Sequence, residues 1–308
     1  MPLRHRVPLA VSALVLAVTG CGTGTDGDAQ GDASLTVVTS FYPLQEAAER
    51  VGGDHASVTN LTKPGAEPHD LELTPKQVLD ATKADALVYL ADFQPSVDDA
   101  AKEADGTAFD VSPYARLDIE AGHDEHEDHA GHDHGAYDPH FWLDPTRYAD
   151  VVDAIAERFA KTDPDHAADY RANAKEFTGE LTQLDEDLAS GLGNCQSTDL
   201  VTSHAAFAYL ADRYGFHQES VTGLTPDEGG SPAALAKVVK HIADEKITTI
   251  YAETLVPSEV ADTVARDAGA KVAVLDPIEG LTDESAGSDY VEIMRSNLKT
   301  VRTGQGCR

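Results

Sequence analysis

Residues 164–192, PDHAADYRANAKEFTGELTQLDEDLASGL, decide the fold. Most of the apolar residues in this stretch recur every three or four positions, which is the spacing of one face of an α-helix. They include Tyr170, Phe177, Leu181, Leu184 and Leu188. Gly191 and Gly193 are typical of a helix end. A helix of about 28 residues is about 42 Å long, so we expect it to cross the molecule and join two parts of the chain.

Short β-branched runs alternate with amphipathic segments on both sides of this stretch. The predicted strands are residues 35–40, 56–61, 86–90, 109–111, 200–203, 219–222, 247–252 and 271–275. Such alternation is typical of a mainly parallel sheet. We therefore predict an α/β fold with two lobes, at residues 34–163 and 194–308, joined by one long rigid helix at residues 164–193.

The N-terminus has the pattern of an export signal. Arg4 and Arg6 precede an uncharged apolar run at residues 7–18, and small residues follow it. This combination predicts a signal peptide at residues 1–20, and the run is too short to span a bilayer as a helix. The mature protein is therefore expected outside the cytoplasm, either on the extracytoplasmic face of the cell membrane or in the periplasm.

The three cysteines suggest two different roles. Cys21 directly follows Val-Thr-Gly, which resembles a bacterial lipobox, so we expect a lipid anchor there and a flexible tether at residues 21–33. Ordinary cleavage near Gly20 is the alternative. Cys195 and Cys307 would form one disulfide in an oxidising compartment, with two free thiols as the alternative.

Charge restricts the partners of this chain. It has 54 acidic and 23 basic residues, for a formal net charge of −31. Such acidity argues against nucleic acid and anionic lipid surfaces as binding partners. It favours cations only in a general way, because many exported bacterial proteins are acidic.

Five of the 13 histidines crowd residues 122–135 together with several carboxylates. They are His123, His126, His129, His132 and His134. We expect this low-complexity segment to be a loop that binds zinc weakly and at several points. A solvated acidic loop without a metal is the alternative.

Four other residues are candidates for one tight site in a cleft between the lobes. His204 and Asp276 each follow a predicted strand directly, and His69 and His140 lie in proline-containing loops. Ligands of open α/β sheets bind outside the carboxyl ends of the strands. Taken alone, Asp276 could instead cap a helix.

The motifs around these residues resemble those of metal-binding solute-binding proteins of zinc and manganese ABC importers, known as cluster A-I. They are GAEPHDLELTP at residues 65–75, DPHFWLDP at 138–145, TSHAAFAYLA at 202–211 and LDPIEGL at 275–281. The resemblance covers nearly the whole chain after the tether. It implies that His69, His140, His204 and Asp276 bind Zn²⁺, which the protein delivers to an ABC permease. The last position varies in the family, so Glu253 or water is an alternative fourth ligand.

The ligand chemistry favours zinc and a carrier. Three imidazoles and one carboxylate suit tetrahedral Zn²⁺, whereas manganese prefers more oxygen ligands. Manganese-type relatives typically have a carboxylate at the position of His204. Four protein ligands leave no open position for catalysis, so we expect no enzyme activity. Asp70, Asp144 and Glu253 are predicted to orient the imidazoles.

Three other functions compete with zinc delivery by a monomer. They are a manganese-binding homologue, a zinc-buffering adhesin and an exported zinc metallohydrolase. The sequence contains no His-Glu-x-x-His, no Gly-x-Ser-x-Gly and no glycine-rich phosphate loop, which disfavours the hydrolase.

Overall fold

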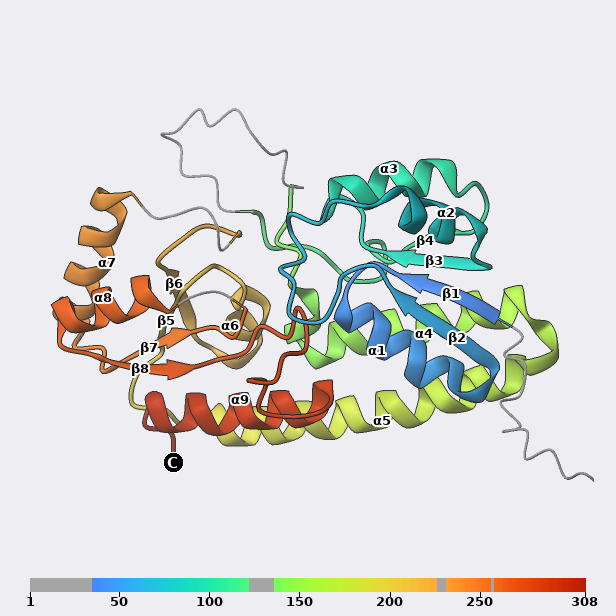
Figure 1. Cartoon of the computed structure of the whole chain (residues 1–308). Helices are drawn as coiled ribbons and strands as arrows, with labels where there is room; N and C mark the ends of the chain where they lie inside the picture. Colours follow the sequence, from blue (N-terminus) through green and yellow to red (C-terminus); the bar gives the residue numbers. More distant parts are fainter. Residues whose placement is uncertain (1–34, 122–135, 226–230, 256–257) are drawn as a thin grey trace, which may run out of the picture. The chain divides into compact units, whose positions relative to one another are not determined.

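The structure is a computed structural model (Figure 1). It describes residues 35–121, 136–225, 231–255 and 258–308. The predicted signal peptide, Cys21, the tether at residues 21–33 and the histidine-rich segment 122–135 lie outside the described residues. None of the described helices combines the length and apolar character that a membrane span requires.

The first lobe is built on a parallel sheet with the strand order β2-β1-β3-β4. Its elements are β1 (Leu35–Thr39), α1 (Tyr42–Gly52), β2 (Ala56–Asn60), α2 (Pro75–Lys83), β3 (Ala86–Tyr89), α3 (Pro95–Glu103) and β4 (Ala108–Asp110). Helix α2 begins at Pro75, because Thr74 and Gln77 form a capping box and Pro75 occupies the first turn. The carboxyl ends of these strands lie at one edge of the sheet, and the loops that follow them provide part of the site.

The second lobe repeats this arrangement with the strand order β6-β5-β7-β8, again entirely parallel. Its elements are β5 (Asp199–Thr202), α6 (Ala208–Tyr214), β6 (His217–Ser220), α7 (Pro232–Glu245), β7 (Thr249–Ala252), α8 (Glu259–Ala268), β8 (Lys271–Val274) and α9 (Tyr290–Gly304). The predicted fold of two parallel α/β lobes is confirmed. The sixth strand was expected two residues further along the chain.

Two long helices lie between the sheets in the sequence, α4 (Pro145–Thr162) and α5 (Ala167–Leu192). The long helix begins three residues later than predicted, because Pro164–His166 forms a separate 3₁₀ turn. Pro164 has no N–H to donate and disfavours helical geometry in the residue before it. The chain therefore breaks there, and α4 and α5 pack against each other along their length.

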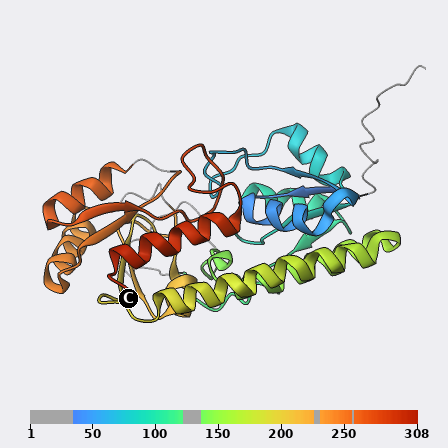
Figure 2. The same ribbon diagram turned by 90° about the horizontal axis from the view of Figure 1, so that it is seen from below.

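Helix α5 buries the apolar face predicted from its periodicity. Tyr170, Phe177, Leu181, Leu184 and Leu188 are fully buried. Helix α5 contacts α1 and α4 as well as α6 and α9, so one continuous core reaches both lobes. Figure 2 shows α9 beside the C-terminal part of α5. Each large apolar side chain buried in this way contributes about 1.5–3 kcal/mol.

A disulfide between Cys195 and Cys307 closes the end of this helix pair. Cys195 follows α5 and Cys307 follows α9. Backbone hydrogen bonds reinforce the junction, since the N–H of Gln196 donates to the carbonyl of Gln305 at 2.9 Å. This pairing is the one that the sequence favours.

Candidate metal centre

Three imidazoles and one carboxylate converge in a buried cluster between the strand ends of the two lobes. Its members are His69, His140, His204 and Glu279, and one ligand atom from each lies within 4.8 Å of all the others. All four residues are at most 5% exposed. Among the described residues, this is the one group of histidines, cysteines and carboxylates close enough together to hold a metal ion.

Each member stands in a loop that a strand or turn positions. His204 comes two residues after β5, and His69 lies in the connection from β2 to α2. His140 directly precedes the 3₁₀ turn Phe141–Leu143, and Glu279 follows β8. The expectation that strand ends would bring distant histidines into one place therefore agrees with the geometry.

A single oxygen is the centre of the cluster. The Oε1 atom of Glu279 lies 3.1 Å from Nε2 of His69, 2.9 Å from Nε2 of His140 and 3.4 Å from Nε2 of His204. Three ring nitrogens thus point at one position from different directions. A small cation could bind at this position with little rearrangement. Zn–N bonds are about 2.0–2.1 Å long, so the three Nε2 atoms would have to move only a short way.

Buried carboxylates on the far side of two rings set their orientation. Oδ1 of Asp138 accepts from Nδ1 of His140 at 2.9 Å and from the backbone N–H of His140 at 2.8 Å. Glu253 accepts from Nδ1 of His204 and, at 2.9 Å, from its backbone N–H. A ring that donates its Nδ1 proton keeps the Nε2 lone pair for a metal.

The residues predicted to orient the imidazoles are only partly the observed ones. Glu253 does so, and its bonds to His204 place it behind the ring. Asp70 is exposed, and its backbone N–H contacts Glu67. Asp144 caps α4 by accepting from the N–H of Thr146. Asp138 was not among the predicted residues, although it stands two residues before His140 in the DPHFWLDP motif.

Asp276 does not join the cluster, and this corrects the predicted fourth ligand. Its Oδ1 accepts from the backbone N–H of Ile278 at 2.8 Å, and its own N–H donates to Asn297 at 3.0 Å. This side chain therefore holds a turn in which Ile278 has a φ of 59°. The turn carries Glu279 into the cluster. Glu279 stands three residues after Asp276 in the LDPIEGL motif, which was the available signal.

Electrostatics couple the four groups. Burial alone would lower the pKa of His204, but Glu253 and Glu279 raise it to about 10. The pKa of His140 is also raised, because Asp138 and Glu279 outweigh the effect of burial. Burial would raise the pKa of Glu279, but the three histidines hold it well below its usual range. In the metal-free protein the cluster therefore retains protons that a metal must displace.

A small cavity of about 90 Å³ adjoins the cluster. Glu279 lines it together with Tyr42, Asn60 and Lys63. The second oxygen of Glu279, Oε2, is buried and accepts no hydrogen bond from the described residues.

The fold and the cluster together define a two-lobed α/β binding protein with a buried imidazole–carboxylate centre. The chain belongs to the family described as zinc-uptake complex component A, periplasmic (ZnuA), which it matches over residues 37–304.

Individual relatives are also named for zinc uptake or zinc binding. The chain is 35% identical to the high-affinity zinc uptake system protein ZnuA of Bacillus subtilis, over 95% of both chains. It is 38% identical to the zinc-binding protein AdcA of Streptococcus pyogenes serotype M6, over 88% of this chain and 56% of the relative. It thus spans about half the length of the AdcA relatives that it matches.

Solved structures share the fold. Zn(II)-bound AdcA of Streptococcus pneumoniae has a TM-score of 0.75 at 33% identity, covering 88% of this chain and 58% of the other. The laminin-binding protein Lmb of Streptococcus agalactiae has a TM-score of 0.77 at 30% identity, covering 88% and 99%. Lmb is described as bifunctional, with adhesin and metal-transporting activity.

Proposed function

We propose that this protein captures Zn²⁺ outside the cytoplasm and delivers it to the permease of an ABC importer. His69, His140, His204 and Glu279 are the ligands in this proposal. The observation that carries it is the convergence of three Nε2 atoms within 3.4 Å of one carboxylate oxygen. Membership of the zinc-uptake family supports the cargo and the transport role.

The donor set favours zinc over manganese and a carrier over an enzyme. Three nitrogens and one oxygen suit Zn²⁺, and manganese would select more oxygen. Four protein ligands close a tetrahedral ion, which leaves no position for a substrate or an activated water. Orientation of His140 and His204 by buried carboxylates adds to affinity rather than to reactivity.

Zinc titration of the purified full chain tests the binding part. Trp142 is the chain's only tryptophan, and its ring centroid lies 5.2 Å from that of His140, so its fluorescence should respond to the ion. We expect one tight equivalent, abolished in His140→Ala and His204→Ala. Lys161→Ala on the exposed end of α4 serves as the control. Tight binding that survives both histidine substitutions would exclude this site.

Growth under zinc chelation tests delivery. A strain lacking the protein should grow poorly with a chelator and recover with added zinc or with the wild-type chain, but not with His204→Ala. The similarity to Lmb makes a zinc-buffering adhesin the second candidate. Unimpaired growth of the deletion strain would favour that candidate.

Attachment through a lipid on Cys21 belongs to the same proposal. Mass spectrometry of the mature protein from the native cell envelope should find an acylated cysteine as the first residue. An unmodified Cys21, or a start elsewhere, would remove the anchor while leaving zinc binding intact.

A further inference from the structure

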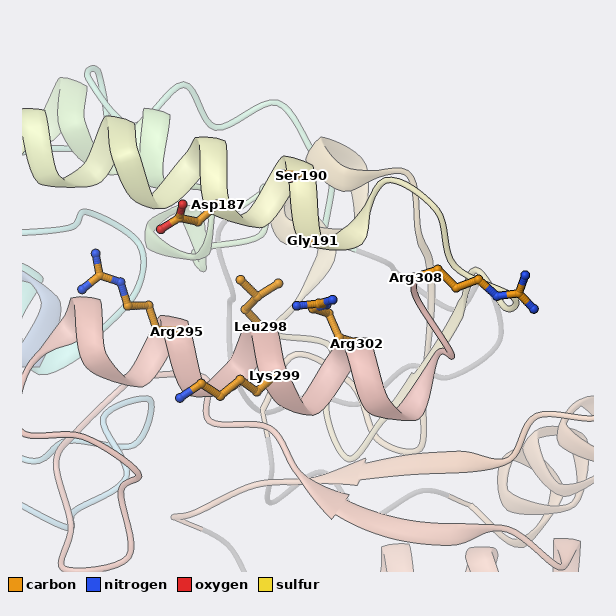
Figure 3. Close-up of a pocket in the computed structure, with 8 residues that line it drawn as sticks. All are labelled: Asp187, Ser190, Gly191, Arg295, Leu298, Lys299, Arg302 and Arg308. Carbon is orange, nitrogen blue, oxygen red and sulfur yellow. The ribbon is translucent and has the colours of Figure 1, made fainter.

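A groove of about 470 Å³ lies between α5 and α9 (Figure 3). None of the four residues of the metal centre lines it. Helix α9 contributes Arg295, Leu298, Lys299 and Arg302, and α5 contributes Asp187 and Gly191. The groove is therefore a second feature of the molecule that zinc binding leaves unexplained.

The C-terminal segment, which forms one wall of the groove, is basic in an acidic chain, whereas the α5 wall contributes Asp187. Residues 293–308 contain four basic residues and no acidic residue, whereas the whole chain has 54 acidic and 23 basic residues. Arg295, Lys299 and Arg302 are exposed. No described carboxylate lies within ion-pair distance of any of them. Five other arginines do pair with carboxylates: Arg50, Arg116, Arg147, Arg171 and Arg213.

The spacing of the groove residues along α9 indicates how far apart the charged groups of a ligand should be. Arg295, Leu298 and Arg302 occupy positions i, i+3 and i+7 of α9, so they share one face. The two arginines are about 10.5 Å apart along the helix axis, so two carboxylates with a similar spacing could each meet one of them. Leu298 lies between them as an apolar contact (Figure 3).

The groove is also built on a rigid base. A Cβ atom on Gly191 would lie 2.8 Å from Cδ1 of Leu298, so the Leu298 side chain packs directly against α5 at this glycine. The disulfide between Cys195 and Cys307 ties together the segments that follow the two helices. A surface held in this way loses little conformational entropy when a partner binds.

We propose that this groove docks an acidic helical segment of a partner protein. Two carboxylates seven positions apart on that segment pair with Arg295 and Arg302, and an apolar side chain midway packs on Leu298. Arginine forks bind carboxylates bidentately, which favours this chemistry. This docking does not depend on the proposed zinc function.

A designed peptide tests the proposal on the full chain. The probe is a fluorescent helical peptide of about 15 residues, with two glutamates seven positions apart and a leucine midway; the control peptide carries glutamine in place of both glutamates. We expect the Arg295→Gln/Arg302→Gln variant to bind the probe about tenfold more weakly. Lys161→Gln/Lys175→Gln removes the same charge from exposed positions elsewhere and should bind like the wild type. Thermal unfolding of each variant shows whether it folds.

Four results would overturn the proposal. Equal weakening in both double variants would indicate unspecific attraction. Equal binding of the glutamine control peptide would remove the role of the carboxylates. Tighter binding of inorganic phosphate or phosphatidylglycerol vesicles than of the peptide, lost in Arg295→Gln/Arg302→Gln, would indicate a phosphate ligand. Dimers abolished by the same variant, without peptide binding, would make a second copy of this chain the occupant.

Discussion

At the scale of single residues, a turn of four residues decides which carboxylate joins the imidazole cluster. Asp276 and Glu279 are both buried carboxylates in the LDPIEGL motif. The Asp276 side chain accepts from the N–H of Ile278 and stabilises the turn, whereas Glu279 contacts three imidazoles. The two residues therefore differ in role although they share a segment and a charge.

Matched amide substitutions separate the two roles. Glu279→Gln removes the anionic ligand and should weaken zinc binding by about 100-fold. Asp276→Asn keeps an oxygen that can accept from Ile278, so its affinity should stay within about threefold of the wild type. Competition with a chromophoric chelator measures both. A large loss in Asp276→Asn with little loss in Glu279→Gln would restore Asp276 as the ligand.

Proton release governs the pH dependence of zinc binding. The raised pKa of His204 means that its ring is protonated at neutral pH in the metal-free protein. Zinc must displace that proton, so affinity rises with pH up to about 10 and falls as pH drops. An ordinary histidine, with a pKa near 6.5, would give a plateau above that pH.

We therefore expect zinc affinity to increase by about tenfold per pH unit for each proton released between pH 7 and pH 9. The stability of the metal-free protein changes with pH in the opposite direction. The raised pKa of His204 stabilises the folded state below about pH 6.5, and this stabilisation is lost as pH rises towards 10. Calorimetry in buffers of different ionisation enthalpy measures the protons released. Flat affinity across this range would contradict the coupling of His204 to Glu253 and Glu279.

At the scale of elements, the start of α4 connects the site to both lobes. Asp144 accepts from the N–H of Thr146 at 2.8 Å and lies 3.3 Å from Nε of Arg147 and from Nε of Arg213. Arg213 belongs to α6 and also pairs with Asp185 of α5 at 2.5 Å. The helix that follows His140 is thus held to α5 and α6 by one buried carboxylate.

Substitution of Asp144 should affect stability more than binding. Asp144→Ala loses the helix cap and both ion pairs, and should lower the free energy of unfolding by about 2 kcal/mol. Asp144→Asn keeps a cap and should lose less. Thermal and chemical unfolding measure both variants. Zinc binding lost at unchanged stability would show that Asp144 orients His140 after all.

At the scale of the whole molecule, one continuous core unites the two lobes. The core cluster includes residues from both sheets together with α5 and α9. Trp142 donates from Nε1 to the carbonyl of Pro277 at 2.8 Å, which joins the loop of His140 to the loop of Glu279. The candidate ligands from the two lobes are therefore held by one continuous core.

The disulfide between Cys195 and Cys307 should contribute to stability without affecting the metal centre. It closes a loop with a sequence separation of 112 residues. Replacing both cysteines with serine should lower the free energy of unfolding by about 4 kcal/mol. Zinc stoichiometry should remain unchanged, because neither sulfur lies in the imidazole cluster. Loss of the tight site in a variant that still folds would mean that this link positions the ligands.

The sequence by itself determined the alternation of strands and helices, the long apolar face around Phe177 and Leu184, and three histidines of one site. These features depend on local periodicity and on side chains at strand ends, which neighbouring residues specify. Only the tertiary structure decided that Glu279 joins them and that Asp138 orients His140. The direction of those carboxylates follows from hydrogen bonds across the fold, such as that between Asp276 and Asn297, and no spacing along the chain encodes such contacts.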